Sequence, residues 1–129
     1  MKQWTKELGL AVTRVGIGLA MAWHGFPKVF GGIESFAKTV DSMGFPMPLF
    51  FAWAAALSEF LGGLLLAAGI FTRWAAFFIF CTMTVAAFIL KADASFAERE
   101  LALLYWLVCI GFMLMGGGRY QLDRWWRKG

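Results

Sequence analysis

Residues 49–70 read LFFAWAAALSEFLGGLLLAAGI, an apolar run in which Glu59 is the one charged side chain. At a rise of about 1.5 Å per residue, a helix of this length crosses the roughly 30 Å hydrocarbon layer of a bilayer. A carboxylate in that layer costs at least about 2.5–3.5 kcal/mol on insertion scales. The stretch therefore predicts a membrane helix whose carboxylate has a partner, a water-filled cavity or a functional role.

The whole chain shares this apolar character. Its 129 residues are 60% hydrophobic and 16% charged, with a mean hydropathy of +0.68. A soluble domain of this size has too small an interior to hide so much apolar surface. Further apolar runs cover residues 8–26, 74–90 and 97–115. Together with residues 49–70 they predict an all-α, antiparallel four-helix transmembrane bundle that forms one domain over residues 1–129.

The connections between these helices differ in length. Only residues 71–73 separate the second and third predicted helices, which forces an antiparallel hairpin. The longer connection between Pro27 and Pro48 carries apolar residues at helical spacing between glycine and proline breakers: Ile33, Phe36, Ala37 and Val40. This pattern predicts a short amphipathic segment on the membrane surface, followed by an extended stretch. Pro27 is expected to end or kink the first helix.

The distribution of Lys and Arg beside the helix ends indicates the orientation. With a cytoplasmic N-terminus, seven such residues lie on the cytoplasmic side: Lys2, Lys6, Arg73, Arg119, Arg124, Arg127 and Lys128. Four lie opposite: Lys28, Lys38, Lys91 and Arg99. The bias predicts a multi-pass protein with both N- and C-termini cytoplasmic. A cleaved secretory signal ending at Ala20-Met21-Ala22 is the alternative for the first helix, but Arg14 inside its apolar core favours retention.

Several function classes are disfavoured by the residues themselves. The basic, aromatic residues 124–128 are interpreted as an anchor to lipid headgroups of the bilayer, so no nucleic acid is expected as a partner. Two cysteines and one histidine are spread over three predicted helices, which excludes a metal site. Cys81 and Cys109 are expected at similar depth on adjacent helices, as packing residues, with a redox role as the alternative. No self-sufficient catalytic motif is present, which leaves open whether the chain is an enzyme.

Small residues predict which helix faces meet. Gly18 and Gly25 share one face of the first helix with Arg14, and Gly62 and Gly63 share a face of the second with Glu59. Counted from the inner helix ends, the backbones of Arg14 and Glu59 differ in depth by roughly 7 Å, which a long arginine can span. The hypothesis is an Arg14–Glu59 ion pair, serving either as a structural lock or as a site for protons or a ligand.

A second polar group is expected near the outer helix ends. His24 precedes Gly25-Phe26-Pro27-Lys28, and Glu98-Arg99-Glu100 open the fourth predicted helix from the same side. An imidazole at this place can pass a proton or donate to a quinone carbonyl. The alternative is an interfacial histidine bonded to a neighbouring carboxylate for structural reasons.

The order and spacing of several motifs resemble the DoxX family of small integral membrane proteins. The motifs are Arg14 with Gly18, HGFPK at 24–28, GFP at 44–46, EFLGG at 59–63, GIFTR at 69–73 and ELALLY at 100–105. The resemblance covers nearly the whole chain. It departs from the family at Gly117 and Gln121, where Gly-Pro-Gly-Arg and Ser-Leu-Asp are more usual.

The resemblance implies a protein of the bacterial cytoplasmic (inner) membrane. The related DoxD protein is a subunit of a thiosulfate:quinone oxidoreductase, and other relatives are linked to redox complexes and thiol stress. The expected function is that of a membrane subunit of a redox complex that binds a quinone or small reducible molecule among its helices, with no intrinsic cofactor. The carried-over positions of the ligand-binding or polar centre are Arg14, His24, Lys28, Glu59 and Glu100.

Two other functions stay open at this point. The first is a non-catalytic anchor for a soluble or membrane oxidoreductase subunit. The second is a small-solute transporter, which would need a homo-oligomer because four short helices enclose little lumen and no inverted repeat is visible.

Overall fold

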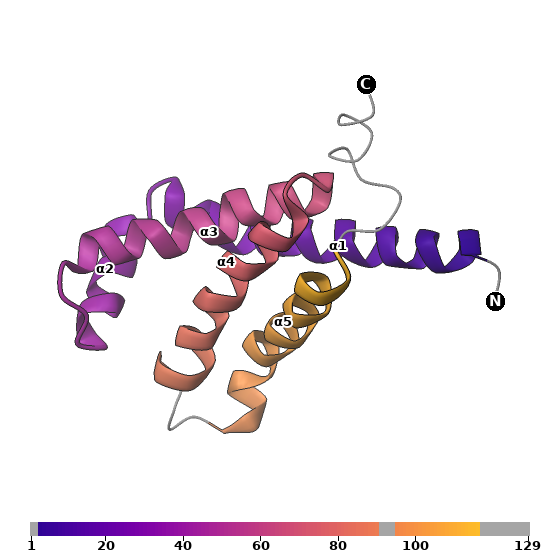
Figure 1. The fold of residues 1–129 in the computed structure, drawn as a ribbon. Coiled ribbons are helices and arrows are strands. Elements are labelled where there is room, and N and C mark those ends of the chain that lie inside the picture. The colour runs from indigo at the N-terminus through magenta and orange to yellow at the C-terminus, as the bar shows by residue number, and fades with distance from the viewer. Residues whose placement is uncertain (1–2, 91–94, 117–129) are drawn as a thin grey trace.

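A computed structural model of the chain describes residues 3–90 and 95–116, which form helices joined by short turns (Figure 1). In chain order these are α1 (Gln3–Val29), α2 (Ile33–Ser42), α3 (Pro48–Ala68), α4 (Thr72–Val85), the π-helical segment η1 (Ala86–Leu90) and α5 (Phe96–Met115). No strand occurs in these two ranges, so the predicted all-α class is confirmed. The predicted headgroup anchor at residues 124–128 lies outside them.

The helices are arranged as two pairs. α1 and α3 lie side by side along the long axis of the molecule, and α4 and α5 form a second pair that runs obliquely away from it (Figure 1). α3 also packs against α4, so this contact joins the two pairs. The short α2 packs against α3 near the end where α1 finishes. The helices predicted from the sequence are present, but a regular four-helix transmembrane bundle is not confirmed.

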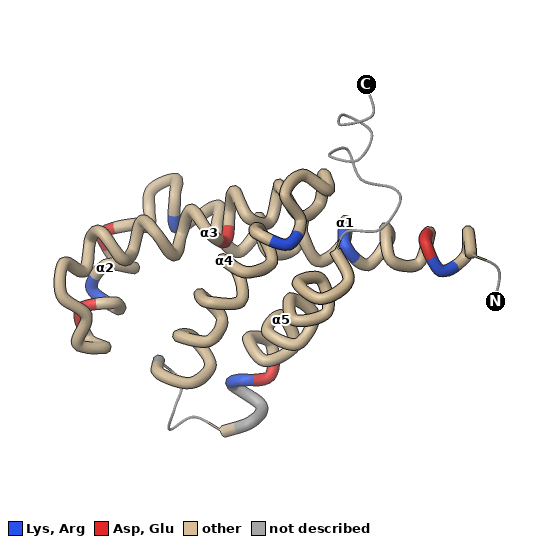
Figure 2. The backbone as a smooth tube through the Cα atoms, viewed as in Figure 1, with Lys and Arg blue, Asp and Glu red and all other residues tan. Residues whose placement is uncertain are grey.

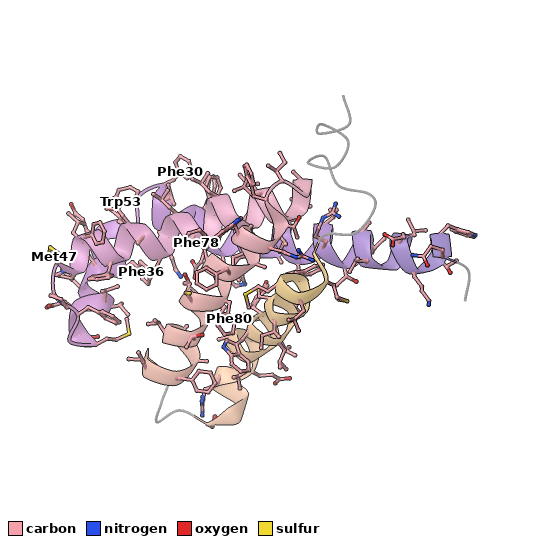
Figure 3. All side chains as sticks on the ribbon, in the orientation of Figure 1. Phe30, Phe36, Met47, Trp53, Phe78 and Phe80 are labelled. Carbon is pink, nitrogen blue, oxygen red and sulfur yellow. The ribbon has the colours of Figure 1, made fainter. Side chains whose placement is uncertain are left out.

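Two helical segments are long and apolar enough to cross a membrane, Pro48–Ala68 and the continuous α4–η1 segment Thr72–Ile89. In each, 33% of the most apolar window is buried within the fold, so most of its residues face outward. Large apolar side chains such as Phe30, Trp53 and Phe78 are exposed (Figure 3). Such a surface is costly in water and natural against lipid.

The other two predicted spans are more polar. Arg14 and His24 lower the apolarity of α1, and Glu98, Arg99 and Glu100 occupy the first turns of α5. Figure 2 shows the contrast, since α3 and α4 carry little charge while charged residues recur along α1 and α2. α1 and α5 are long enough to span a membrane, but their described residues do not meet the limits on hydropathy and charge that α3 and the α4–η1 segment meet.

Glycines bring α1 and α3 into backbone contact. A Cβ at Gly18 would lie 2.5 Å from the Ala67 nitrogen, and one at Gly63 would lie 2.5 Å from the Ala22 nitrogen. No side chain larger than hydrogen fits at such distances, and this close approach is how small residues pack membrane helices. The predicted meeting of the two small-residue faces is therefore confirmed.

The ends of α1 and α2 follow from local residues. α1 continues two residues past Pro27, and the amides of Phe30 and Gly32 donate to the carbonyls of Phe26 and Pro27. The expectation that Pro27 ends the helix is wrong. A proline in the last turn removes only one backbone hydrogen bond, so the helix can continue past it. The predicted amphipathic segment is confirmed as α2, which buries Val40.

A core cluster joins α4 and α5 to the middle of the α1/α3 pair. Its large buried side chains include Met21, Leu66, Ile79, Cys109 and Phe112. Trp106 of α5 adds a polar link, because its indole donates a 3.0 Å hydrogen bond to the hydroxyl of Thr84 on α4. Cys109 belongs to this core as predicted, whereas Cys81 is exposed.

Candidate functional site

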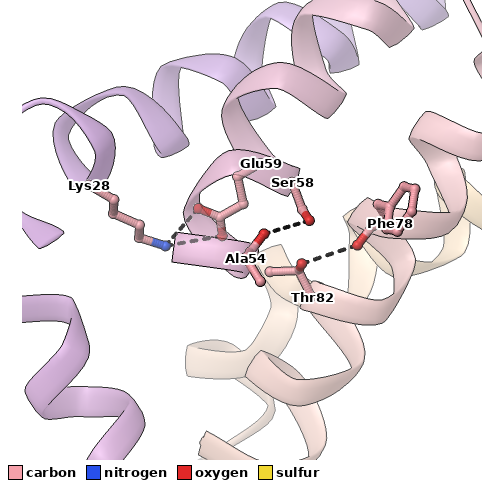
Figure 4. A network of polar contacts seen from close by, with 6 residues as sticks. All are labelled: Lys28, Ala54, Ser58, Glu59, Phe78 and Thr82. Atoms are coloured by element: carbon pink, nitrogen blue, oxygen red, sulfur yellow. Dashed lines mark hydrogen bonds and ion pairs between the residues drawn. The ribbon is translucent and has the colours of Figure 1, made fainter. Parts of the chain in front are cut away.

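Glu59 is held in an ion pair with Lys28. The ammonium of Lys28 on α1 donates to both carboxylate oxygens of Glu59 on α3, at 3.0 Å to Oε1 and 2.8 Å to Oε2 (Figure 4). The carboxylate side chain is 4% exposed and the lysine side chain 31% exposed. A charge-assisted, forked contact of this kind compensates part of the cost of removing the carboxylate from water.

The predicted Arg14–Glu59 ion pair is wrong. The Arg14 side chain is 2% exposed, and its Nε donates a 2.9 Å hydrogen bond to the carbonyl of Leu66. Its Nη2 lies 3.4 Å from the carbonyl of Ala67. These carbonyls belong to the last turn of α3, where the helix dipole favours a cation, and the Leu66 carbonyl also accepts a 3.2 Å hydrogen bond from the Gly69 amide. Arg14 thus caps α3 from the neighbouring helix.

The register of α1 against α3 explains this difference. Gly18 lies against Ala67 and Gly25 against Phe60. The two helices are therefore antiparallel, and a residue seven positions later on α1 faces a residue seven positions earlier on α3. By this register Arg14 is level with the turn after α3, near Phe71, which is twelve residues beyond Glu59. At 1.5 Å per residue that is about 18 Å of helix, too far for an arginine to reach. Lys28, at the opposite end of α1, is close enough.

His24 and Glu100 stay apart from the ion pair. His24 is exposed and meets α5 through its ring, which packs edge-on against Tyr105 with 5.8 Å between the centroids. Glu100 is exposed, with no hydrogen bond or ion pair to another described residue. Of the five predicted site residues, the structure brings together Lys28 and Glu59 and separates Arg14, His24 and Glu100 from them.

A cavity of about 350 Å³ adjoins the ion pair. Lys28 and Glu59 form one part of its wall, and α2, α3, α4, η1 and the turn between α2 and α3 supply the rest. The other lining side chains are almost all apolar, among them Phe36, Val40, Phe51, Phe77, Phe78 and Val85. Ligand pockets in proteins have volumes of about 300–1,000 Å³ and combine apolar walls with a few placed polar groups.

α2 covers this cavity and is tied to the ion pair. The Lys28 ammonium lies 4.5 Å from the centroid of the Phe36 ring, a cation–π distance, so one lysine contacts both α3 and α2. Val40 on the same face of α2 is buried and also lines the cavity. The helix is bounded by Gly31 and Gly44, both at positive φ. Its placement over the cavity therefore depends on two glycine turns and on Phe36.

Three small polar side chains complete the lining. The hydroxyl of Ser58 donates to the carbonyl of Ala54 at 2.7 Å, and that of Thr82 to the carbonyl of Phe78 at 3.1 Å (Figure 4). Each hydroxyl is thereby satisfied within its own helix but keeps lone pairs that can accept from a ligand. The exposed thiol of Cys81 lines the same cavity.

The cavity residues outside the ion pair are not predicted by the sequence as site residues. Phe36 and Val40 stand out there only as the apolar face of an amphipathic segment. Ser58 precedes Glu59 directly, which is a signal that could have been used. Thr82 and Cys81 carry no local signal, since their role depends on where α4 packs. Within the residues that the structure describes, no group of three or more His, Cys, Asp or Glu could hold a metal ion.

The fold and the site define a class: a small helical membrane protein with a partly buried ion pair beside an apolar cavity. The profile of the DoxX family matches residues 9–92. The chain belongs to the DoxX family.

Curated relatives extend over most of the chain. An uncharacterized protein of Haemophilus influenzae is 34% identical over 121 residues, covering 88% of this chain and 87% of the relative. The Bacillus subtilis protein named "Putative oxidoreductase CatD" is 32% identical over 124 residues, covering 95% and 90%. The Escherichia coli "Inner membrane protein YphA" is 35% identical over 78 residues, covering 60% and 55%. No solved structure matches the chain.

Proposed function

We propose that this chain is an integral membrane subunit of a redox complex and that the cavity beside Lys28 and Glu59 binds a quinone or another small reducible molecule. The observation that carries the proposal is the position of a forked ion pair with a buried carboxylate in the wall of an otherwise apolar cavity. The name of the Bacillus subtilis relative gives independent support for redox chemistry.

The lining suits a flat ring with polar oxygens. The aromatic side chains of Phe36, Phe77 and Phe78 offer faces and edges against which such a ring can pack. An ammonium has three N–H donors, and the carboxylate of Glu59 occupies at most two of those on Lys28. The remaining donor is available for a carbonyl oxygen of the ligand.

The ion pair also provides proton chemistry at the same place. When a quinone is reduced, each of its oxygens takes up one electron and one proton. Lys28 can hydrogen-bond to an oxygen that gains charge, and Glu59 can accept or return the proton, because the two groups are already in contact. The chain supplies no electron carrier of its own among these residues, so the electrons come from a partner oxidoreductase subunit that carries a redox cofactor.

The membrane placement is part of the proposal. We infer a multi-pass protein of the bacterial cytoplasmic membrane with both termini in the cytoplasm, in keeping with the Lys and Arg bias and with the name of the Escherichia coli relative. In this orientation the ion pair lies toward the outer side, because Lys28 stands in the last turn of α1.

Quinone binding is tested with the protein reconstituted in lipid nanodiscs that contain a decyl-tailed benzoquinone at fixed mole fraction. Bound quinone is measured by its retention and by the absorbance of its ring. We expect wild type to bind and Lys28→Met to bind about tenfold more weakly, equivalent to the loss of about 1.4 kcal/mol. Lys38→Met is the matched control, because Lys38 is exposed on α2 and does not line the cavity.

Two results would overturn this function. Wild type that retains no quinone, alone or with a co-purified partner, leaves the non-catalytic anchor and the small-solute transporter as the remaining functions. Equal binding by Lys28→Met and Lys38→Met removes the ion pair from the ligand site.

A further inference from the structure

A second cavity continues the first along the groove between α3 and α4. It measures about 440 Å³, and it shares three lining residues with the ion-pair cavity, Ala54, Ser58 and Phe78. Its remaining lining comes from both helices and the turn that joins them: Leu57, Leu61, Gly62, Leu65, Phe71, Trp74 and Ala75. The two spaces therefore meet side by side at these shared residues.

The polarity changes along this path. The first cavity holds the charges of Lys28 and Glu59. Beyond the shared residues no charged side chain lines the second cavity, and Ser58 is its one hydroxyl. Along α4 and the residues that flank it, the lining runs from Ala86 in the first cavity to Phe71 at the far end of the second, fifteen residues or about 22 Å of helix. The shape is that of a site with a polar end and a long apolar arm.

We propose that the second cavity holds the apolar tail of the ligand whose polar ring lies beside Lys28 and Glu59. The ligand class is then a long-tailed amphiphile such as an isoprenoid quinone, rather than a small water-soluble oxidant. This inference rests on the proposed function and adds the tail to it. The occupant follows from adjacency, because the groove shares Ala54, Ser58 and Phe78 with the cavity that contains the polar groups.

The tail contributes to the choice of ligand and to the orientation of its ring more than to the hydrophobic free energy of binding. A tail in this groove leaves lipid rather than water, so it gains packing contacts and little hydrophobic free energy. A ligand whose ring is held by Lys28 and whose tail is held along α3 and α4 can bind in only one orientation. A ring without a tail lacks that constraint and binds less often in the productive orientation.

The test compares a decyl-tailed benzoquinone with the same ring lacking the tail, at equal concentration within nanodisc lipid. Wild type is expected to bind the tailed compound at least about tenfold more tightly. Leu61→Trp fills the groove without touching the ion-pair cavity, so it should abolish this difference and leave binding of the bare ring unchanged. Leu64→Trp is the matched control, since Leu64 is exposed on α3 and lines neither cavity.

The outcomes separate this inference from the function on which it rests. If neither compound binds, the proposed function fails and the tail site fails with it. If both bind equally in wild type and in Leu61→Trp, the ring site stands and the tail site is wrong.

A photolabelling experiment on wild type needs no variant. A benzoquinone with a diazirine at the tail end should label Leu61, Leu65 or Trp74, and unlabelled tailed quinone should compete. Equal labelling by a phospholipid with the same diazirine in its acyl chain would show that the groove takes any lipid tail, which would overturn the assignment to this ligand.

Discussion

The ammonium of Lys28 and the carboxylate of Glu59 form a forked ion pair whose two members are unequally buried. The lysine side chain is 31% exposed and the glutamate side chain 4%. The residues lie 31 positions apart in sequence and are brought together by the antiparallel contact of α1 with α3. Removal of the lysine therefore leaves a buried carboxylate without a cation, whereas removal of the glutamate leaves a partly exposed ammonium.

Lys28→Met should destabilise the protein more than Glu59→Gln does. The first variant leaves a buried carboxylate without a cation, for which we expect a loss of about 3 kcal/mol. The second leaves a lysine that can turn toward solvent or lipid headgroups, for which we expect about 1 kcal/mol. Reversible unfolding in mixed micelles measures both, with Glu34→Gln on the exposed face of α2 as control. The reverse order of effects would contradict the unequal burial of the two side chains.

Arg14→Met should destabilise α3 by removing the cap on its last turn. The carbonyls of Leu66 and Ala67 would lose their side-chain donor, at a cost of about 1–3 kcal/mol. Lys6→Met is the control, because Lys6 is an exposed cation of the same helix. Arg14→Lys should restore little, since a lysine does not reproduce the planar fork of a guanidinium.

Arg14 and Glu59 should act independently. Because about 18 Å of helix separates their levels, the unfolding free-energy changes of Arg14→Met and Glu59→Gln should add to within about 0.5 kcal/mol in the double variant. A larger coupling energy, measured in the same micelles, would bring back the direct pair that this separation excludes.

Gly63→Ala should separate α1 from α3. A methyl group there would lie 2.5 Å from the Ala22 nitrogen and 2.6 Å from the Gly18 carbonyl oxygen, and backbone cannot yield as a flexible side chain can. We expect about 1–3 kcal/mol of destabilisation. Gly16→Ala is the matched control, because its Cβ meets nothing within 4 Å and alanine favours a helix by about 1 kcal/mol. Similar unfolding midpoints for the two variants would disprove the close contact.

Phe36→Leu should raise the reactivity of Cys81 toward an uncharged, lipid-soluble thiol reagent. The variant removes a cation–π contact of about 0.5–1 kcal/mol, which favours displacement of α2 by roughly two- to fivefold. Mass spectrometry of the two cysteine peptides gives an internal reference, because Cys109 is buried. Phe30→Leu is the control, since Phe30 is exposed and does not line the cavity. Unchanged labelling of Cys81 would mean that Phe36 does not hold α2 in place.

The helices are predictable from the sequence because each depends on local residues. The apolar run at residues 49–70 corresponds to α3 at Pro48–Ala68, and the helical spacing of Phe36 and Val40 is enough to predict α2. The close pairing of two membrane helices is also predictable in kind, because glycines on one face of each helix imply close approach. The offset between the two helices is not encoded in any local pattern.

That offset decides the partner of Glu59. The predicted depths of Arg14 and Glu59 are counted from the cytoplasmic ends of their apolar runs, which assumes that these two ends lie at the same level. In the structure α1 starts at Gln3, and its first turns project beyond α3. The apolar run of the first helix stops before Lys28, although α1 itself continues to Val29 and carries this lysine to the carboxylate. The cavity escapes prediction for a related reason, since Phe36, Ser58 and Thr82 meet only through tertiary packing.

The glycine contact between α1 and α3 determines from which side a molecule dissolved in the bilayer can approach Glu59. Because the backbones of α1 and α3 are in contact at these glycines, the interface between the two helices leaves no space for a ligand to pass through to Glu59. Under the proposed function, a ligand would reach Glu59 from the flank where α2 packs and α4 diverges, and a partner oxidoreductase would have to leave that flank uncovered.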